Sequence, residues 1–444
     1  MVAIEVAAEL LVSVLMLGVL AMVFGRKLNI SYVPLFILLG ILVGPVLGFI
    51  PRSFSHELFD YLRVFGLVII LFTEGHNLSW KLLKRNSTTI LLLDTLGVLL
   101  TAFLSGWFFS WLFGAPFLVG FLFGSIISAT DPATLIPLFR QYRVEQDIET
   151  TIVTESIFND PLGIVLTTVA VAMLYPGAVS KVFAFFSGHV GLYGASVLYF
   201  LYELLVSVVV GIAMGFFGYW FIKKAELFDF PEVEIFALGL AFLTFLAGEK
   251  LEASGYLAAT VSGLVLGNFK VIGRFRSLAV MEKVLRAIEL EVEFNESLSA
   301  IATLFIFFLL GSSLNLGIFA GNLLKGLLVA YFVMLVARPI AALPILPRWG
   351  VRRYLFISLE GPRGIVPSAL ASLPLSLAVK YGGNLSVGWG ELILAVTVIT
   401  VFASIVTETL WLPLLKRLLL ETETVEDRIR KMRRGRGVSL SRGK

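Results

Sequence analysis

The chain has 444 residues, of which 58% are hydrophobic and 15% charged, and its mean hydropathy is +0.93. Soluble domains carry roughly 45–50% apolar and 25% charged residues, so this composition indicates a membrane protein. The absence of cysteine excludes disulfides and thiolate metal sites, and the three histidines lie too far apart for a zinc motif. The net charge of +4 gives no support to nucleic-acid binding, because the basic excess lies in one short terminal segment.

The apolar runs predict an all-α polytopic protein with about thirteen membrane-spanning helices, since a span needs about 20 predominantly apolar residues. Each run is bounded by charges or by Pro/Gly clusters. The predicted windows, in chain order, are 4–24, 31–48, 59–73, 88–113, 116–139, 148–174, 193–222, 232–248, 254–269, 288–312, 317–345, 354–379 and 390–415.

The distribution of basic residues predicts the orientation. The odd-numbered loops between the windows hold most of the loop Lys and Arg residues, and the even-numbered loops hold few. Because short cytoplasmic loops carry the Lys/Arg excess, we expect the N-terminus outside and the C-terminus in the cytoplasm. Residues 416–444 form a tail with ten basic and four acidic residues, which we expect to be solvated or to touch lipid headgroups.

The thirteen windows suggest two six-helix repeats of opposite sense, as in inverted-repeat transporters. Repeat one covers about 1–175, a linking helix about 193–222 and repeat two about 232–415, within one transporter domain over 1–415. The fifth and twelfth windows correspond under this scheme, and both are interrupted by polar residues and proline. We therefore expect both of these helices to be unwound at mid-membrane.

The fifth window contains Thr130 and Asp131 directly before Pro132. Proline removes a backbone donor and disfavours helical geometry in the preceding residue, which frees carbonyls around Ala129 and Thr130. Unwound backbone at this depth is tolerated only where it lines a cavity or is buried in protein. A plain proline kink is the alternative, but the neighbouring aspartate favours an ion site.

The sixth window carries Thr154, Glu155, Ser156, Asn159 and Asp160 within two turns. Residues four apart share a helix face, so Ser156 lies beside Asp160 and Glu155 lies beside Asn159. Carboxylate, amide and hydroxyl oxygens are the ligands that suit a hard cation. The segment therefore predicts a cation site shared with the fifth helix.

Counting from the cytoplasmic ends places Glu155 and Arg338 at a similar depth, about 10 Å from the inner boundary. We expect them to form a structural ion pair, which leaves Asp160 as the uncommitted carboxylate. Glu74 ends the third window, and its depth places it at the cytoplasmic mouth of the same site.

The twelfth window holds Glu360 and Arg363 in a second Gly/Pro break. Arg363 is predicted to compensate Asp131, Glu360 or the C-terminal end of a broken helix. Asp94 in the fourth window and Glu408 in the thirteenth are further candidate partners, and the sequence does not choose among these alternatives.

Taken together, these elements resemble the NhaP-type sodium/proton antiporters of bacteria and archaea, within the monovalent cation:proton antiporter family. The resemblance is carried by Thr130-Asp131-Pro132, Glu155-Ser156, Asn159-Asp160-Pro161, Arg338 and Gly361-Pro-Arg363-Gly.

This resemblance implies an antiparallel crossing of the unwound fifth and twelfth helices. It also implies a core (88–174 and 317–415) that moves against an interface domain (4–73 and 193–312), and a homodimer in the plasma membrane. Electroneutral one-for-one exchange is implied because Asn159 precedes Asp160 where electrogenic relatives have two adjacent aspartates. The protein would be a transporter and not an enzyme, with no cofactor beyond the transported sodium or lithium ion and the proton.

The predicted ion ligands are Asp160, Ser156, Thr130, Asp131 and Glu74, with Asn159 and Thr154 orienting the site. A buried aspartate holds either a proton or a cation, so exclusive occupancy of Asp160 would give exchange. A potassium/proton antiporter and a solute symporter on the same architecture remain alternatives, since fold alone does not fix the substrate. A membrane-embedded protease is disfavoured because its sequence motifs are missing.

Overall fold

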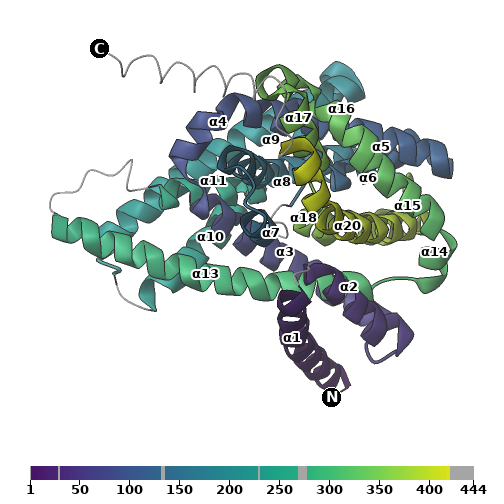
Figure 1. The fold of residues 1–444 in the computed structure, drawn as a ribbon, viewed down its shortest axis with the longest axis horizontal. Helices are drawn as coiled ribbons and strands as arrows, with labels where there is room; N and C mark the ends of the chain where they lie inside the picture. Colours follow the sequence, from purple (N-terminus) through teal and green to yellow (C-terminus); the bar gives the residue numbers. More distant parts are fainter. Residues whose placement is uncertain (1, 29–30, 132–135, 229–230, 269–277, 421–444) are drawn as a thin grey trace, which may run out of the picture.

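The computed structural model describes residues 2–28, 31–131, 136–228, 231–268 and 278–420. Pro132, residues 269–277 with the basic Lys270, Arg274 and Arg276, and tail residues 421–444 lie outside these described residues. Within the described part the chain forms helices and no strand. Figure 1 shows these helices in chain colours.

The first half of the chain contains the helices of the first six windows. They are α1 (Val2–Leu28), α2 (Val33–Ile41) with η1 (Leu42–Val46), α3 (Arg52–Asn77), α4 (Trp80–Leu92) with η2 (Leu93–Gly97) and α5 (Val98–Phe113), α6 (Phe117–Ile127), α7 (Ile136–Gln141) and α8 (Gln146–Leu174).

The second half supplies the remaining windows. Its helices are α9 (Lys181–Ala225), α10 (Glu232–Lys250), α11 (Gly255–Gly267), α13 (Leu278–Ser312), α14 (Leu316–Gly321), α15 (Leu323–Phe332), η4 (Val333–Ala337), α16 (Arg338–Ala342), η5 (Leu343–Ile345), α17 (Leu346–Leu359), α18 (Ile365–Leu370), α19 (Leu373–Tyr381), α20 (Val387–Leu415) and η6 (Lys416–Leu420).

Every predicted window contains helix over its described residues, which confirms the all-α polytopic fold. Six helical stretches are long and apolar enough to cross a membrane by themselves. They are Asn86–Phe113, Gln146–Leu174, Lys181–Ala225, Leu285–Ser312, Leu323–Leu359 and Val387–Leu420. Shorter apolar helices, α6 and α11 among them, complete the bundle.

The largest difference from a predicted boundary is at the start of α9. Helix α9 begins at Lys181, well before the predicted start at residue 193. The chain turns at Gly191, where φ is 73° and ψ is 175°, so a short separate helix precedes the span. Glycine adopts this left-handed φ without the penalty that a Cβ would bring. The hydrophobic window missed this segment because polar residues such as Ser187 and His189 interrupt its apolar pattern.

Small residues bring α3 and α11 into direct backbone contact. A Cβ on Gly75 would lie 2.1 Å from the Thr260 carbonyl oxygen, and one on Gly263 would lie 2.1 Å from the Phe72 carbonyl oxygen. Close approach of this kind is a main source of helix association in membranes, where no hydrophobic driving force acts between helices. These two helices therefore form a tightly packed pair.

The helices pack in two sets. Helix α3 packs on α11 and α13, and α11 also packs on α9 and α10. In the other set α6 packs on α5 and α8, and α20 packs on α15 and α19. Figure 1 shows α13 along one side of the molecule, with α15 and α20 together in another part. Helix α18 contacts α3 and α13 of the first set and α6, α8 and α20 of the second, so it lies where the sets meet.

Candidate ion-binding site at the helix crossing

Two broken helices meet in the interior of the molecule. Helix α6 ends at Ile127 and the chain continues without helical structure through Asp131, while α17 ends at Leu359 and the chain is unwound until α18 begins at Ile365. The Asp131 backbone amide donates to the Pro362 carbonyl oxygen at 2.8 Å. The two unwound segments are therefore joined directly through their backbones, as the resemblance implied.

Arg363 neutralises the end of α6. Its Nη1 donates to the carbonyl oxygens of Ser128 at 2.9 Å and Ala129 at 3.1 Å, and the side chain is fully buried. These carbonyls lie at the C-terminal end of α6, where the helix dipole is negative. The sequence left several partners open for Arg363. In the structure it binds the C-terminal end of a broken helix.

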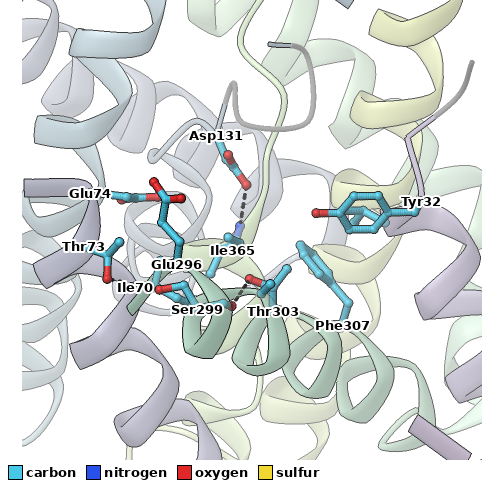
Figure 2. A pocket seen from close by; sticks show the side chains of 12 residues that line it. Tyr32, Ile70, Thr73, Glu74, Asp131, Glu296, Ser299, Thr303, Phe307 and Ile365 are labelled. Atoms are coloured by element: carbon cyan, nitrogen blue, oxygen red, sulfur yellow. Dashed lines mark hydrogen bonds between the residues drawn. The ribbon is translucent and has the colours of Figure 1, made fainter. Parts of the chain in front are cut away.

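Asp131 performs the opposite task at the start of α18. Its Oδ2 accepts a hydrogen bond from the Ile365 backbone amide at 3.3 Å (Figure 2). A carboxylate is stabilised at this positive end of a helix. Gly364 makes the approach possible, since a Cβ there would lie 2.1 Å from Asp131 Oδ2. Each broken helix is thus capped by a charged side chain from the other unwound segment.

Helix α8 holds the unwound part of α6 through Thr130. The Asn159 Oδ1 accepts from the Thr130 amide at 3.0 Å, and its Nδ2 donates to Thr130 Oγ1 at 2.6 Å. Ser156 Oγ donates to the Thr130 carbonyl oxygen at 2.5 Å. The residues predicted to share a site are brought together, and Asn159 bridges the two helices.

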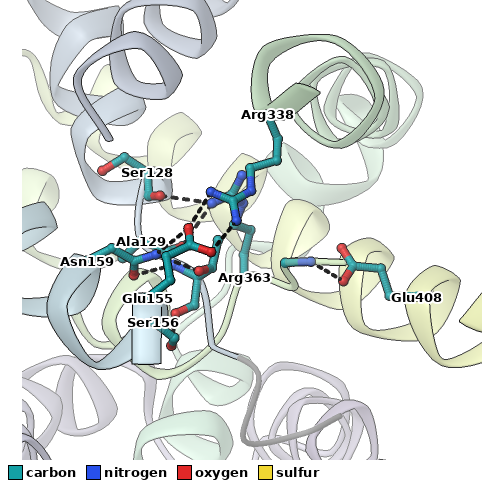
Figure 3. Close-up of polar contacts among 10 residues, drawn as sticks. Ser128, Ala129, Glu155, Ser156, Asn159, Arg338, Arg363 and Glu408 are labelled. Atoms are coloured by element: carbon teal, nitrogen blue, oxygen red, sulfur yellow. Dashed lines mark hydrogen bonds and ion pairs between the residues drawn. The ribbon is translucent and has the colours of Figure 1, made fainter. Parts of the chain in front are cut away.

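Glu155 and Arg338 face each other in a two-point ion pair. Arg338 Nη1 lies 2.5 Å from Glu155 Oε1, and Nη2 donates to Oε2 at 2.7 Å. The exposed fractions of the two side chains are 0% for Glu155 and 4% for Arg338. Figure 3 shows this pair beside the unwound end of α6, with Arg363 nearby.

Asp160 follows Asn159 on α8, beside the unwound end of α6. It is buried, and its Oδ1 has no hydrogen-bond partner among the described residues. Glu74, Asp131 and Asp94 all act on it electrostatically. An unpaired carboxylate in this position is costly unless it binds a proton or a cation.

A cavity of about 170 Å³ lies against the crossing, between α3, α13 and α18 (Figure 2). Glu74, Asp131 and Glu296 supply its carboxylates, whereas Asp160 is not among its lining residues. Hydroxyl groups from Tyr32, Thr73, Ser299 and Thr303 complete the polar lining. Oxygen donors of this kind suit a hard cation.

The polar residues that α13 contributes to this cavity were not predicted from the sequence. Glu296, Ser299 and Thr303 line it, and Glu296 Oε1 accepts from Asn77 Nδ2 at 2.9 Å. Their spacing of three and four residues places them on one face of the helix, and this polar stripe was the signal available in the sequence.

Helix α20 stabilises the unwound backbone of the twelfth span. Glu408 Oε2 accepts from the Gly361 amide at 2.8 Å, and Ser404 Oγ accepts from the Arg363 amide at 3.0 Å. Glu408 therefore contacts backbone near Arg363. Both carboxylate oxygens of the fully buried Glu360 have no hydrogen-bond partner among the described residues.

Two predicted site residues are not brought to the crossing. Asp94 does not contact Arg363: it acts electrostatically on the Glu155–Arg338 pair, and neither of its carboxylate oxygens has a hydrogen-bond partner in the described part of the chain. The reason is its position in η2, which packs against α8 and α16. Thr154 is buried but, within the same described part, makes no hydrogen bond to the unwound segments.

The oxygen atoms of the crossing and of the adjacent cavity suit a small cation. Carboxylate, amide, hydroxyl and carbonyl oxygens converge at the crossing, together with the Arg363 guanidinium. Among the described residues, no three His, Cys, Asp or Glu side chains form a group able to hold a metal ion. A permanently bound divalent metal therefore has no ready-made site there.

Comparisons with known proteins point in the same direction. The model of the family described as "Sodium/hydrogen exchanger, transmembrane" matches residues 11–417. Two relatives from Methanocaldococcus jannaschii are Na(+)/H(+) antiporter 1, which is 33% identical over 91% of this chain and 94% of its own, and probable Na(+)/H(+) antiporter 2, which is 31% identical over 93% and 99%. Among more distant relatives, at 25–27% identity, some are named K(+)/H(+) antiporters and one, from Aphanothece halophytica, is named a Na(+)/H(+) antiporter.

A solved structure agrees with the sequence relatives. The sodium proton antiporter MjNhaP1 from Methanocaldococcus jannaschii, determined at pH 8, superimposes with a TM-score of 0.82 at 31% identity, covering 95% of this chain and 100% of that chain. The family model spans most of the sequence, and its members are transporters and not enzymes. The chain therefore belongs to the transmembrane sodium/hydrogen exchanger family.

Proposed function

We propose that this protein exchanges sodium or lithium ions for protons across the plasma membrane, and so serves pH homeostasis and salt tolerance. One observation carries the proposal. At the crossing, Glu155 is paired with Arg338, and Asp131 and Arg363 cap broken helices, whereas Asp160 has an oxygen without a partner. Asp160 also shares a face of α8 with Ser156, which contacts the Thr130 carbonyl, and this position assigns the transported ion to it.

The cation site is proposed to consist of Asp160, Ser156 and the Thr130 carbonyl, with Asp131 and Glu74 nearby. Ser156 already contacts the Thr130 carbonyl, so a small movement of the hydroxyl would present both oxygens to an ion. Glu74 and Glu296 line the adjacent cavity and attract cations towards it.

Exchange follows from competition at Asp160. The carboxylate binds one proton or one sodium ion, never both, and each neutralises its charge. If the site changes sides only when it is neutral, a proton gradient drives sodium the opposite way. One-for-one, electroneutral exchange is expected because Asn159 adds no second titratable group beside Asp160.

The movement is proposed to divide the two sets of helices. The set around α6, α8 and α20 would be the core that carries the ion, and the set around α3, α11 and α13 would be the interface domain of a homodimer embedded in lipid. Helix α18, which contacts both sets, lies at their boundary. The basic residues of the odd-numbered loops support an N-terminus outside and a C-terminus in the cytoplasm.

The test uses the purified protein in liposomes that contain a pH-sensitive dye. Adding sodium or lithium should move protons in the wild type, and Asp160→Asn should abolish the response. Lower pH should raise the apparent KM for sodium, by up to about tenfold per pH unit, without changing the maximal rate, because protons compete at the same site. Sodium-driven proton movement that persists in Asp160→Asn would refute the assignment.

Potassium is the second candidate cation, because more distant relatives are named K(+)/H(+) antiporters. Running the same assay with sodium, lithium and potassium separates the choices. A solute symporter would respond to none of the three ions alone with proton counterflow.

A further inference from the structure

A second polar cavity lies away from the crossing. It has a volume of about 180 Å³ and is bounded by α9, the end of α10, the α10–α11 connection and the start of α11. Its lining includes Tyr199, Glu203, Glu249, Glu252 and Tyr256. Three carboxylates and two tyrosine side chains thus gather in a place that the exchange mechanism does not use.

This cavity is on the opposite side of the membrane from the end of α3. Asn268, just after α11, accepts a hydrogen bond from the Trp80 amide at 2.7 Å, so the end of α11 adjoins the end of α3. The cavity lies at the other end of α11, about 20 Å away for a helix of 13 residues. In the proposed orientation it faces the outside.

Glu203 is the unusual residue of the cavity. It lies within the span formed by α9, its exposed fraction is 2%, and its Oε2 has no hydrogen-bond partner in the described part of the chain. Glu249 repels it electrostatically, and the Tyr199 side chain lies within hydrogen-bonding reach of it. Glu249 itself accepts a hydrogen bond from the Gly255 amide at 3.0 Å. No Lys or Arg is among the residues that line the cavity.

Glu252 is hydrogen-bonded to other residues of the cavity wall. Its carboxylate accepts from Ser180 Oγ at 2.9 Å and from the Val182 amide at 3.0 Å, while its backbone carbonyl accepts from the Tyr199 hydroxyl at 3.4 Å. These bonds tie the α10–α11 connection to the start of α9. The oxygens left for a ligand are therefore those of Glu203 and Glu249.

We propose that this cavity binds a monovalent cation, of the sodium class, at a site separate from the transport site. A buried carboxylate with a second carboxylate beside it and no basic partner requires a positive charge. Oxygen ligands suit a hard cation. Among the described residues no three His, Cys, Asp or Glu side chains are placed to hold one metal ion together, which disfavours a tightly held divalent ion. The bound ion would pin α9 to the α10–α11 connection.

The test removes the transport site first. In the Asp160→Asn protein, thermal unfolding is measured in sodium chloride and in choline chloride at equal ionic strength, together with equilibrium binding of radioactive sodium. We expect a saturable rise of the unfolding midpoint with sodium and binding of one ion per chain. Adding Glu203→Gln or Glu249→Gln should abolish both signals, whereas the exposed Glu57→Gln should leave both unchanged.

Three results would overturn the inference. Sodium stabilisation that survives both glutamine variants places the ion elsewhere, and stabilisation by calcium or magnesium alone excludes a monovalent site. Stabilisation by acid but not by sodium means that Glu203 and Glu249 share a proton. The use of two separate variants protects the test against one that fails to fold. The result is independent of transport by Asp160, which is measured in liposomes.

Discussion

Replacement of Arg338 by glutamine tests the structural role of the buried ion pair. The change leaves Glu155 fully buried, and the nearest remaining donor is Asn159 Nδ2 at 3.4 Å. Removing one partner of a buried ion pair costs about 3–5 kcal/mol, because the other charge stays desolvated and unpaired. We therefore expect the Arg338→Gln protein to lose that much stability in equilibrium unfolding by SDS in mixed micelles, followed by tryptophan fluorescence.

A double-mutant cycle separates the pair from its surroundings. The double variant Glu155→Gln/Arg338→Gln carries no buried charge at this position, so it should recover about 2–3 kcal/mol relative to the sum of the single variants. It should also retain sodium-driven proton transport, because the pair is assigned no ion to exchange. Arg286→Gln, at an exposed position, serves as the matched control. Arg338→Gln stability within about 0.5 kcal/mol of that control, or strict additivity in the cycle, would refute the reasoning.

Three further variants test other parts of the molecule. Gly364→Ala should lower the free energy of unfolding by about 1–3 kcal/mol and stop transport, because its Cβ would lie 2.1 Å from Asp131 Oδ2. A transport rate equal to that of the wild type would show that the crossing tolerates the methyl group. Asn159→Ala should cost about 1–3 kcal/mol by leaving the buried Thr130 amide without its acceptor, and an unchanged unfolding curve would contradict this. At Glu252, burial raises the pKa, but hydrogen bonds from a backbone amide and a serine hydroxyl outweigh it and hold that pKa below its ordinary value of 4.5. Since the folded protein stabilises the carboxylate form, the free energy of unfolding of the wild type should exceed that of Glu252→Gln by about 1 kcal/mol above pH 4.5. This difference in unfolding free energy should shrink as the pH falls further, and a difference that does not depend on pH would count against the assignment.

The sequence was sufficient for the features that depend on burial and helix depth. Glu155 and Arg338 have opposite charges at matching depth in two apolar helices, and they meet in the structure. The breaks in the fifth and twelfth spans followed from their Gly and Pro residues. Hydrophobicity and the cost of buried charge thus predicted the fold and its crossing.

The features that depend on helix rotation or on backbone groups could not be predicted from the sequence. Arg363 binds two backbone carbonyl oxygens. Every residue has such a carbonyl, so the sequence does not mark the ones that bind Arg363. Glu296 lies on a polar stripe of α13, but only the packing of α13 on α3 turns that stripe towards the cavity. Asp94 stayed one of several candidate partners of Arg363 for the same reason, since depth alone does not give the direction in which a side chain points.

The exchange of caps between the broken helices has a consequence for how the protein is made. Asp131 receives its backbone partner from Ile365, which is 234 residues further along the chain. During synthesis the fifth span enters the bilayer long before that partner exists. The carbonyls of Ser128 and Ala129 likewise have no contact with Arg363 until that later residue has been synthesised. Assembly of the first half must therefore stop short of its final form, and the transport pathway is completed only when the twelfth span is inserted.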